Sequence, residues 1–219
     1  MESYTTPVAT ALLLNWKRPD NLKKTIKSIR AQAIPVEIFL WDNNPGDRFD
    51  VDLHIRSDKN LMCWPRWFMA NYAKSKWVFS MDDDLAFRDG GVLADAIHIA
   101  EELDAPVGVG GLVNTEEDFQ YIFNRTQTTP CDAIQGRFLL IKRDKLNDVS
   151  LMPREEGESG PRIEDDIIIS ASSMEKFVIG MLHRRMAELQ TGQESLCLQE
   201  DHKPSRKKTL DKYFPYESN

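Results

Sequence analysis

The first half of the chain alternates short apolar runs with amphipathic stretches, and polar turn formers separate them. The apolar runs have the length of buried β-strands, and the amphipathic stretches repeat apolar residues at helical spacing, as in Leu22, Ile26 and Ile29. Strands that alternate with helices predict an α/β fold with a mixed, mostly parallel sheet flanked by helices. The expected elements are strand 8–14, helix 19–31, strand 36–41, strand 51–55, helix 62–73 and strand 77–81.

The second half is less regular. We expect residues 1–202 to form a single domain, followed by a basic and aromatic tail at 203–219. Within this tail, residues 203–208 are either solvated, fold over a bound diphosphate or contact an anionic acceptor. Residues 177–181 suit a strand or a continued helix, and the polar residues 153–161 predict a mobile loop. The other expected elements are helices 92–103 and 186–189, strands 119–123, 133–141 and 196–198, and a glycine-rich strand or strand pair at 107–113.

Three strands of the predicted sheet end in polar side chains. Asn15 to Arg18 follow the first strand, Asp42 to Asn44 follow the second, and Asp82 to Asp84 follow the strand at 77–81. The carboxyl ends of parallel strands meet at one edge of a sheet, and open α/β sheets bind their ligands there. We therefore expect these side chains to contribute to one site.

The triplet Asp82-Asp83-Asp84 predicts a divalent metal site. Neighbouring carboxylates repel one another, and burying them without partners is costly. Oxygen ligands suit Mg²⁺ or Mn²⁺, and these ions commonly complete their coordination with the phosphates of a substrate. The alternative is a solvated acidic turn after a strand.

A second acidic cluster, Glu164-Asp165-Asp166, precedes the apolar residues 167–169. Acidic residues also stabilise the N-terminus of a helix, which is the purely structural explanation. Chemically, a positioned carboxylate can deprotonate an acceptor hydroxyl, while a metal ion takes up the charge that develops on a diphosphate leaving group. The two clusters together predict group transfer from a nucleotide-activated donor to a hydroxyl.

Composition narrows the partners and the setting. The 219 residues carry a formal net charge of −7, which argues against general nucleic-acid binding. No apolar run approaches the roughly 18 residues that span a bilayer, and the N-terminus lacks the basic region of a signal peptide. The cysteines are odd in number and widely spaced, so we expect buried thiols in a reducing, cytoplasmic setting.

The order of these motifs resembles the GT-A type of glycosyltransferase over roughly residues 8–202. The blocks Leu40 to Asn44 and Met81 to Asp84 look like the exostosin-like branch, and the first block also looks like the larger inverting branch. The matching positions are the Arg-containing turn Asn15 to Pro19, the base-contacting Asp42 to Asn44, the Asp-x-Asp-like Asp82 to Asp84, the helix-opening Glu164 to Asp166 and the late His202.

The resemblance implies a metal-dependent transfer of a sugar from a nucleotide-diphosphate sugar, a UDP-sugar by preference, to a hydroxyl of a glycan or another acceptor. It implies Asp165 as the base, with Asp166 as the alternative register and Glu164 on acceptor hydroxyls. Asp84, Asp82 and His202 would bind Mn²⁺ or Mg²⁺. The implied donor-binding residues are Asn15, Arg18, Asp42, Asn43, Asn60, Arg66, Asp82, Asp83, Gln135 and Gly136.

Two other functions fit the same residues. A nucleotidyltransferase also combines an α/β sheet with metal-binding acids, but that class carries a glycine-rich loop after its first strand, and Asn15 to Pro19 contain no glycine. A non-catalytic nucleotide-sugar-binding module would not be expected to keep both acidic clusters. The acids at the helix start favour inversion at the sugar carbon, whereas the exostosin-like similarity favours retention.

Overall fold

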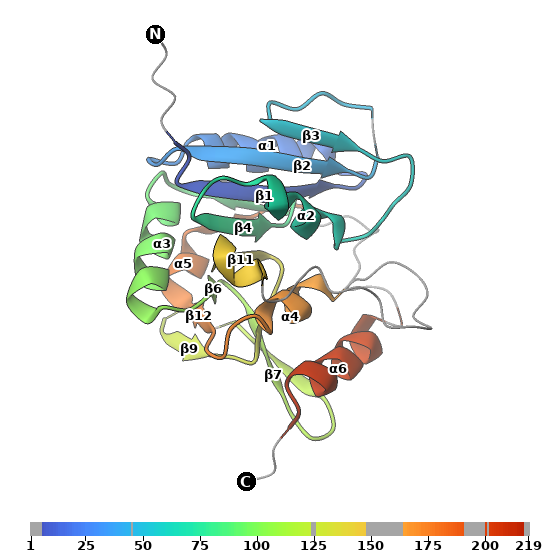
Figure 1. The fold of residues 1–219 in the computed structure, drawn as a ribbon, viewed down its shortest axis with the longest axis vertical. Coiled ribbons are helices and arrows are strands. Elements are labelled where there is room, and N and C mark those ends of the chain that lie inside the picture. The colour runs from blue at the N-terminus through green and yellow to red at the C-terminus, as the bar shows by residue number, and fades with distance from the viewer. Residues whose placement is uncertain are drawn as a thin grey trace.

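An eight-stranded sheet forms the centre of the computed structural model, which describes residues 6–44, 46–123, 126–147, 164–190, 200 and 202–216 (Figure 1). The first four strands in the order below run parallel, and β11 is antiparallel to both of its neighbours. This arrangement confirms the predicted mixed, mostly parallel α/β sheet. The order across the sheet is β3 (Leu53–Arg56), β2 (Val36–Asp42), β1 (Ala9–Asn15), β4 (Trp77–Met81), β11 (Phe138–Lys142), β6 (Val107–Gly108), β12 (Phe177–Ile179) and β9 (Thr128–Pro130).

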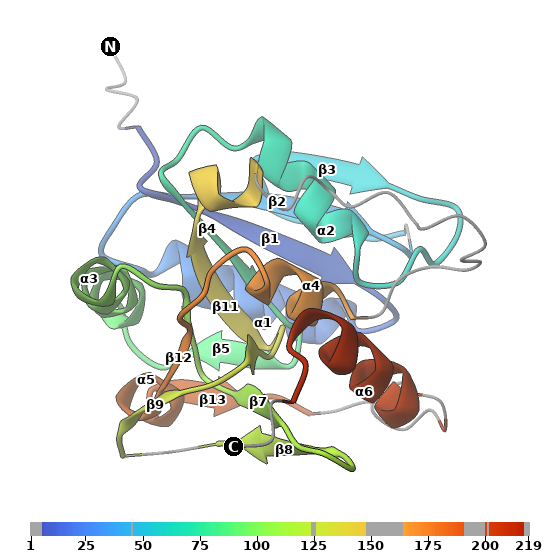
Figure 2. The same cartoon turned by 60° about the horizontal axis from the view of Figure 1, so that its bottom comes forward.

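Alternate side chains of the central strands pack into two apolar cores, one on each face of the sheet. Leu13 of β1 packs in the core that includes helices α1 (Pro19–Arg30) and α3 (Val92–Leu103). Leu12 packs in the core that includes α2 (Pro65–Phe68), the 3₁₀ turn η1 (Met69–Tyr72) and α4 (Asp165–Ser170). Figure 2 shows helices on both faces of the sheet. Burial on both faces explains why these strands are continuous apolar runs in the sequence.

Two smaller sheets and several short elements complete the described part of the chain. One sheet is antiparallel and contains β10 (Ala133–Ile134), β7 (Gly111–Asn114) and β8 (Phe119–Ile122). The other pairs β13 (Met186–Glu188) with β5 (Leu85–Phe87). The remaining elements are the 3₁₀ turn η2 (Arg143–Asn147) and the helices α5 (Gly180–Arg184) and α6 (His202–Tyr213).

The structure corrects several predicted elements in the second half. Residues 186–189 were expected to be helical, but Met186–Glu188 form a strand because β5 offers them a pairing partner. The expected single strand at 133–141 is two strands in different sheets, β10 and β11. Residues 107–113 form a strand pair that is likewise divided between two sheets, and 177–181 contain the end of a strand and the start of a helix.

The basic segment after residue 202 is a helix and not a solvated tail. Helix α6 buries Arg206 and Leu210, which are one helical turn apart and so lie on the same face of the helix. The division at residue 202 into a domain and a tail stays a prediction. The predictions for 153–161 and 196–198 lie outside the described residues. Every helix in the described ranges is too short or too polar to cross a membrane.

Gly108 in β6 has no space for a side chain, and this gives a test of the core. A methyl group there would lie 2.7 Å from the carbonyl oxygen of Phe138 and would overlap Ile134 Cγ2. We expect Gly108→Ala to destabilise the protein by about 1–3 kcal/mol, because overpacked cores must shift. Gly46→Ala is the control, since nothing lies within 4 Å of the corresponding position. Equal melting temperatures for the two variants, measured by circular dichroism, would contradict the packing described here.

Candidate functional site

A cavity of about 880 Å³ lies where β1 and β4 end, at the edge predicted for the ligand. It brings together polar residues from both halves of the chain, including residues of the two acidic clusters. Most of the predicted site residues line it. They are Arg18, Asn43, Asn60, Arg66, Asp82, Asp83, Asp84, Gln135, Gly136, Asp165, Asp166 and His202.

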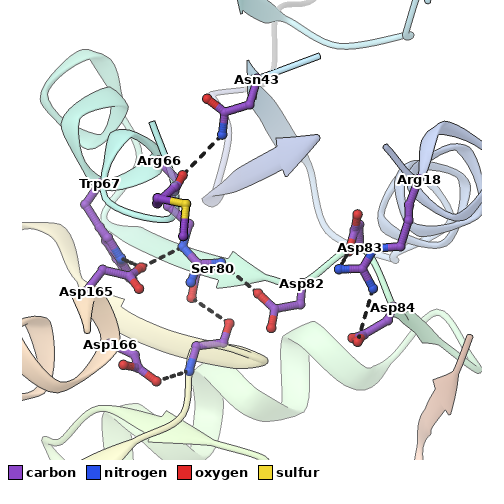
Figure 3. A network of polar contacts seen from close by, with 12 residues as sticks. Arg18, Asn43, Arg66, Trp67, Ser80, Asp82, Asp83, Asp84, Asp165 and Asp166 are labelled. Atoms are coloured by element: carbon purple, nitrogen blue, oxygen red, sulfur yellow. Dashed lines mark hydrogen bonds and ion pairs between the residues drawn. The ribbon is translucent and has the colours of Figure 1, made fainter. Parts of the chain in front are cut away.

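The three acids after β4 have different partners. Asp83 Oδ1 lies 2.9 Å from Arg18 Nη2, Asp84 Oδ2 lies 3.6 Å from Arg18 Nη1, and Asp82 turns instead toward Arg66 (Figure 3). Burial raises the pKa of Asp83 to about 7; Arg18 opposes this shift, and the neighbouring acids add to it. Burial therefore disfavours the charged form of Asp83, and its contact with Arg18 does not fully compensate for this.

Asp84 fits a role in holding a cation. Its Oδ1 is buried and has no hydrogen-bond partner within the described residues. Burial raises the pKa of Asp84, and the negative charge of Asp82 raises it further, so a bound divalent cation would stabilise the ionised carboxylate. No group of three potential protein ligands surrounds one point in the described ranges. A metal here would therefore need further oxygen ligands from its substrate.

Asp165 opens α4 and is almost fully buried, with 1% of its surface exposed. Its Oδ2 accepts hydrogen bonds from Arg66 Nε at 2.8 Å and from the indole Nε1 of Trp67 at 2.7 Å (Figure 3). No hydrogen bond within the described residues reaches its other oxygen, Oδ1. Burial raises the pKa of Asp165 although Arg66 opposes the shift. One carboxylate oxygen is thus fixed, and the other remains able to accept a proton.

Asp166, the next residue, uses both oxygens for structure. Arg206 Nη1 and Nη2 donate to Oδ1 and Oδ2 at 3.0 and 2.8 Å. The backbone N–H groups of Ile167 and Gly136 each add a bond of 2.9 Å, one to each oxygen. Burial disfavours the charged form of Asp166, but the Arg206 guanidinium and these hydrogen bonds hold its pKa below its usual range. The two neighbouring acids therefore differ in their capacity to act as a base.

Arg66 connects the two acidic clusters. It is 2% exposed, and its guanidinium donates through Nε to Asp165 and through Nη1 to Asp82, each at 2.8 Å (Figure 3). A side chain on Gly136 would place its Cβ 2.6 Å from Arg66 Nη2, so the glycine leaves room for this guanidinium. Arg66 thereby holds the Asp165 carboxylate in a fixed position relative to Asp82, at the end of β4.

Three predicted site residues do not line the cavity. Asn15 Nδ2 donates to Asp42 Oδ1 at 2.8 Å, and both residues are fully buried. The other carboxylate oxygen of Asp42 lies 3.1 Å from His54 Nε2. Glu164 accepts a hydrogen bond from the Ser205 hydroxyl of α6. Direct roles for these three in ligand binding remain predictions, and the structure gives each of them a partner inside the protein.

The cavity also contains residues that sequence reasoning missed. Arg206 lies in the basic run 203–208, for which the sequence predicted either a solvated tail or contact with an anionic ligand. Its i, i+4 spacing with Leu210 is nevertheless a signal of a buried helical face. Glu188 comes from the strand predicted as a helix. Tyr121 in β8 and Phe123, the first residue after that strand, also line the cavity. Nothing in their local sequence distinguishes them from core aromatics.

Comparisons with known proteins add evidence at the level of the fold. No family model matches the sequence, and no curated protein matches it. Among solved structures, residues 1–349 of S. aureus TarS in complex with UDP-GlcNAc match with a TM-score of 0.57 and 13% identity, covering 78% of this chain and 56% of that one. The mannosyltransferase PcManGT from Pyrobaculum calidifontis, in complex with GDP-Man and Mn²⁺, matches with a TM-score of 0.52 and 14% identity, covering 77% and 52%.

These likenesses show the fold class. The chain has the GT-A fold, the fold of nucleotide-sugar glycosyltransferases, as its motifs implied. It spans little more than half the length of these structures, and it covers 58% of a further TarS 1–349 structure.

Proposed function

We propose that this protein is a metal-dependent glycosyltransferase that moves a sugar from a nucleotide-diphosphate sugar to an acceptor hydroxyl with inversion. The observation that carries the proposal is Asp165, which lines the cavity with one oxygen fixed by Arg66 and Trp67 and the other without a partner in the described residues. The GT-A fold and the donors bound to the two similar structures, UDP-GlcNAc and GDP-Man, support a nucleotide sugar as the substrate.

In the proposed reaction, Asp165 accepts the proton of the acceptor hydroxyl. The acceptor oxygen forms a bond to the anomeric carbon while the bond from that carbon to the diphosphate breaks and its electron pair leaves with the diphosphate. A base with a raised pKa is suited to this step, because it takes up the proton more readily. Arg66 holds Asp165 in position and is not itself consumed or changed.

Asp84 and Asp82 would hold the metal ion, with His202 as a further candidate at the cavity end of α6. Mn²⁺ is supported by the complex of the similar mannosyltransferase, and Mg²⁺ has the same preference for oxygen ligands. When bound, the ion would neutralise the charge on the diphosphate. Arg18, which already pairs with Asp83 and Asp84, would lie beside it.

A reducing, cytoplasmic setting is also part of the proposal. Cys63 and Cys131 are free thiols, and burial raises the pKa of each. Thiols with raised pKa values are poor nucleophiles at neutral pH, so Cys63 is expected to shape the cavity without reacting.

The metal assignment can be tested through nucleotide affinity. We expect Mn²⁺ to strengthen UDP binding to the wild-type protein and Asp84→Ala to reduce this gain by at least about tenfold, because it removes the carboxylate oxygen that is buried without a partner in the described residues. Isothermal titration with and without Mn²⁺ measures the gain. Asp20→Ala is a matched control, since that carboxylate is 90% exposed. An unchanged Mn²⁺ effect in Asp84→Ala would place the metal elsewhere.

A further inference from the structure

Two stacked aromatic rings form part of the cavity wall and have no role in the proposed reaction. Tyr121 and Phe123 are 42% and 44% exposed, and their ring planes are only 16° apart with centroids separated by 5.9 Å. Large aromatic side chains usually bury most of their surface. Two neighbouring rings exposed inside a cavity that many charged side chains also line therefore indicate a surface for an apolar face of a ligand.

The rings lie on the side of the cavity that holds the candidate base. Figure 2 shows β8 far from β2 and β3, the strands beside the predicted nucleoside position. Tyr121 lies near Arg206, the partner of Asp166, and both residues line the cavity. Its ring also contacts Phe119, over which Lys203 of α6 lies at 5.7 Å. This places the aromatic pair next to α4 and α6, where an acceptor would have to approach Asp165.

A buried polar atom completes this part of the cavity. Gln135 Oε1 has no hydrogen-bond partner within the described residues, although it is shielded from solvent. Gly110 lies against both Gln135 and Phe123, since a Cβ on this glycine would overlap Gln135 Oε1 and lie 2.9 Å from the Phe123 ring. The Gln135 amide and the Phe123 ring therefore lie side by side over Gly110. A buried acceptor atom without a partner favours a ligand that supplies a donor.

We propose that the acceptor is a saccharide and that one of its sugar rings stacks on Tyr121 and Phe123, an inference that rests on the proposed function. A pyranose has an apolar face of C–H groups and a rim of hydroxyls. Its face would cover the aromatic rings, and a hydroxyl would donate to Gln135 Oε1. A nucleobase could also stack on aromatic rings, but the predicted nucleoside position lies at the other end of the cavity.

Aromatic ¹H–¹³C NMR of the Phe- and Tyr-labelled protein tests this inference. The protein is first saturated with UDP and diamagnetic Mg²⁺, and is then titrated with methyl glycosides of glucose, galactose, mannose, N-acetylglucosamine and xylose and with their disaccharides. We expect at least one saccharide to shift the signals of Tyr121 and Phe123. We expect Phe123→Ala to raise the Kd of that saccharide about tenfold, the effect of losing a well-stacked ring.

The control variant is Tyr72→Ala, which removes an aromatic ring that is 58% exposed and lies outside the cavity lining. It should leave the saccharide Kd unchanged. The inference is overturned if no saccharide shifts these signals, if Phe123→Ala binds the saccharide as well as wild type, or if Phe123→Ala instead loses UDP affinity by the same factor. Failure of the proposed function gives a different result, in which saccharides shift the ring signals but the wild-type protein neither binds UDP nor releases it from a donor.

Discussion

Asp165→Asn is expected to lower the rate of nucleoside diphosphate release from a nucleotide sugar by about 10²- to 10⁴-fold, the usual contribution of a general base. The asparagine keeps an oxygen that can accept from Arg66 Nε and Trp67 Nε1, so the local structure and donor binding should persist. The substitution replaces the other oxygen of Asp165, Oδ1, which accepts the proton in the proposed reaction, with an amide nitrogen that cannot accept one. The rate can be measured with water as the acceptor, which also requires deprotonation.

Asp166→Asn is the matched comparison, because it makes the same chemical change one residue along the chain. Its main expected effect is a lower melting temperature, since Arg206 would stay buried without a negative partner. If Asp166→Asn abolished turnover and Asp165→Asn did not, the base would be Asp166 and the assignment would be wrong by one residue.

Arg206→Met is expected to destabilise the protein by about 3–5 kcal/mol, because it leaves the buried carboxylate of Asp166 without its charge partner. For a protein of this size the loss corresponds to a fall in melting temperature of roughly 6–20 °C. Differential scanning calorimetry measures it. Lys208→Met serves as a control, since this exposed lysine lies on the same helix, and its removal should change stability by less than about 0.5 kcal/mol.

A double variant separates the ion pair from the packing of Arg206. Combining Arg206→Met with Asp166→Asn removes the unpaired charge, so part of the lost stability should return. If Arg206→Met proved as stable as Lys208→Met, then the contact between α6 and α4 would not depend on this ion pair.

The sheet could be predicted because its information is local. Strands such as β1 and β4 are buried on both faces, so each appears as an apolar run with a polar end. The same reasoning predicted that Asn15 to Arg18 and Asp82 to Asp84 would meet. The short strand β13 was missed because three residues carry too little periodicity, and only pairing with β5 makes them extended.

The site was only partly predictable for the same reason. Asp165 and Asp166 are adjacent and chemically identical in the sequence, and only their partners, Arg66 and Arg206, distinguish them. Those partners come from distant elements that the sequence does not place beside α4. Similarly, the sequence places Asp42 at a strand end but does not reveal its partners Asn15 and His54, and its contact with a nucleoside stays a prediction.

The most direct test of the central claim is nucleotide release by the purified wild-type protein. The protein would be incubated with UDP- and GDP-sugars in the presence of Mn²⁺ or Mg²⁺, and free nucleoside diphosphate would be measured over time. We predict slow release from at least one donor, faster with an acceptor and abolished by a chelator. The absence of both release and nucleotide binding across the panel would contradict the account.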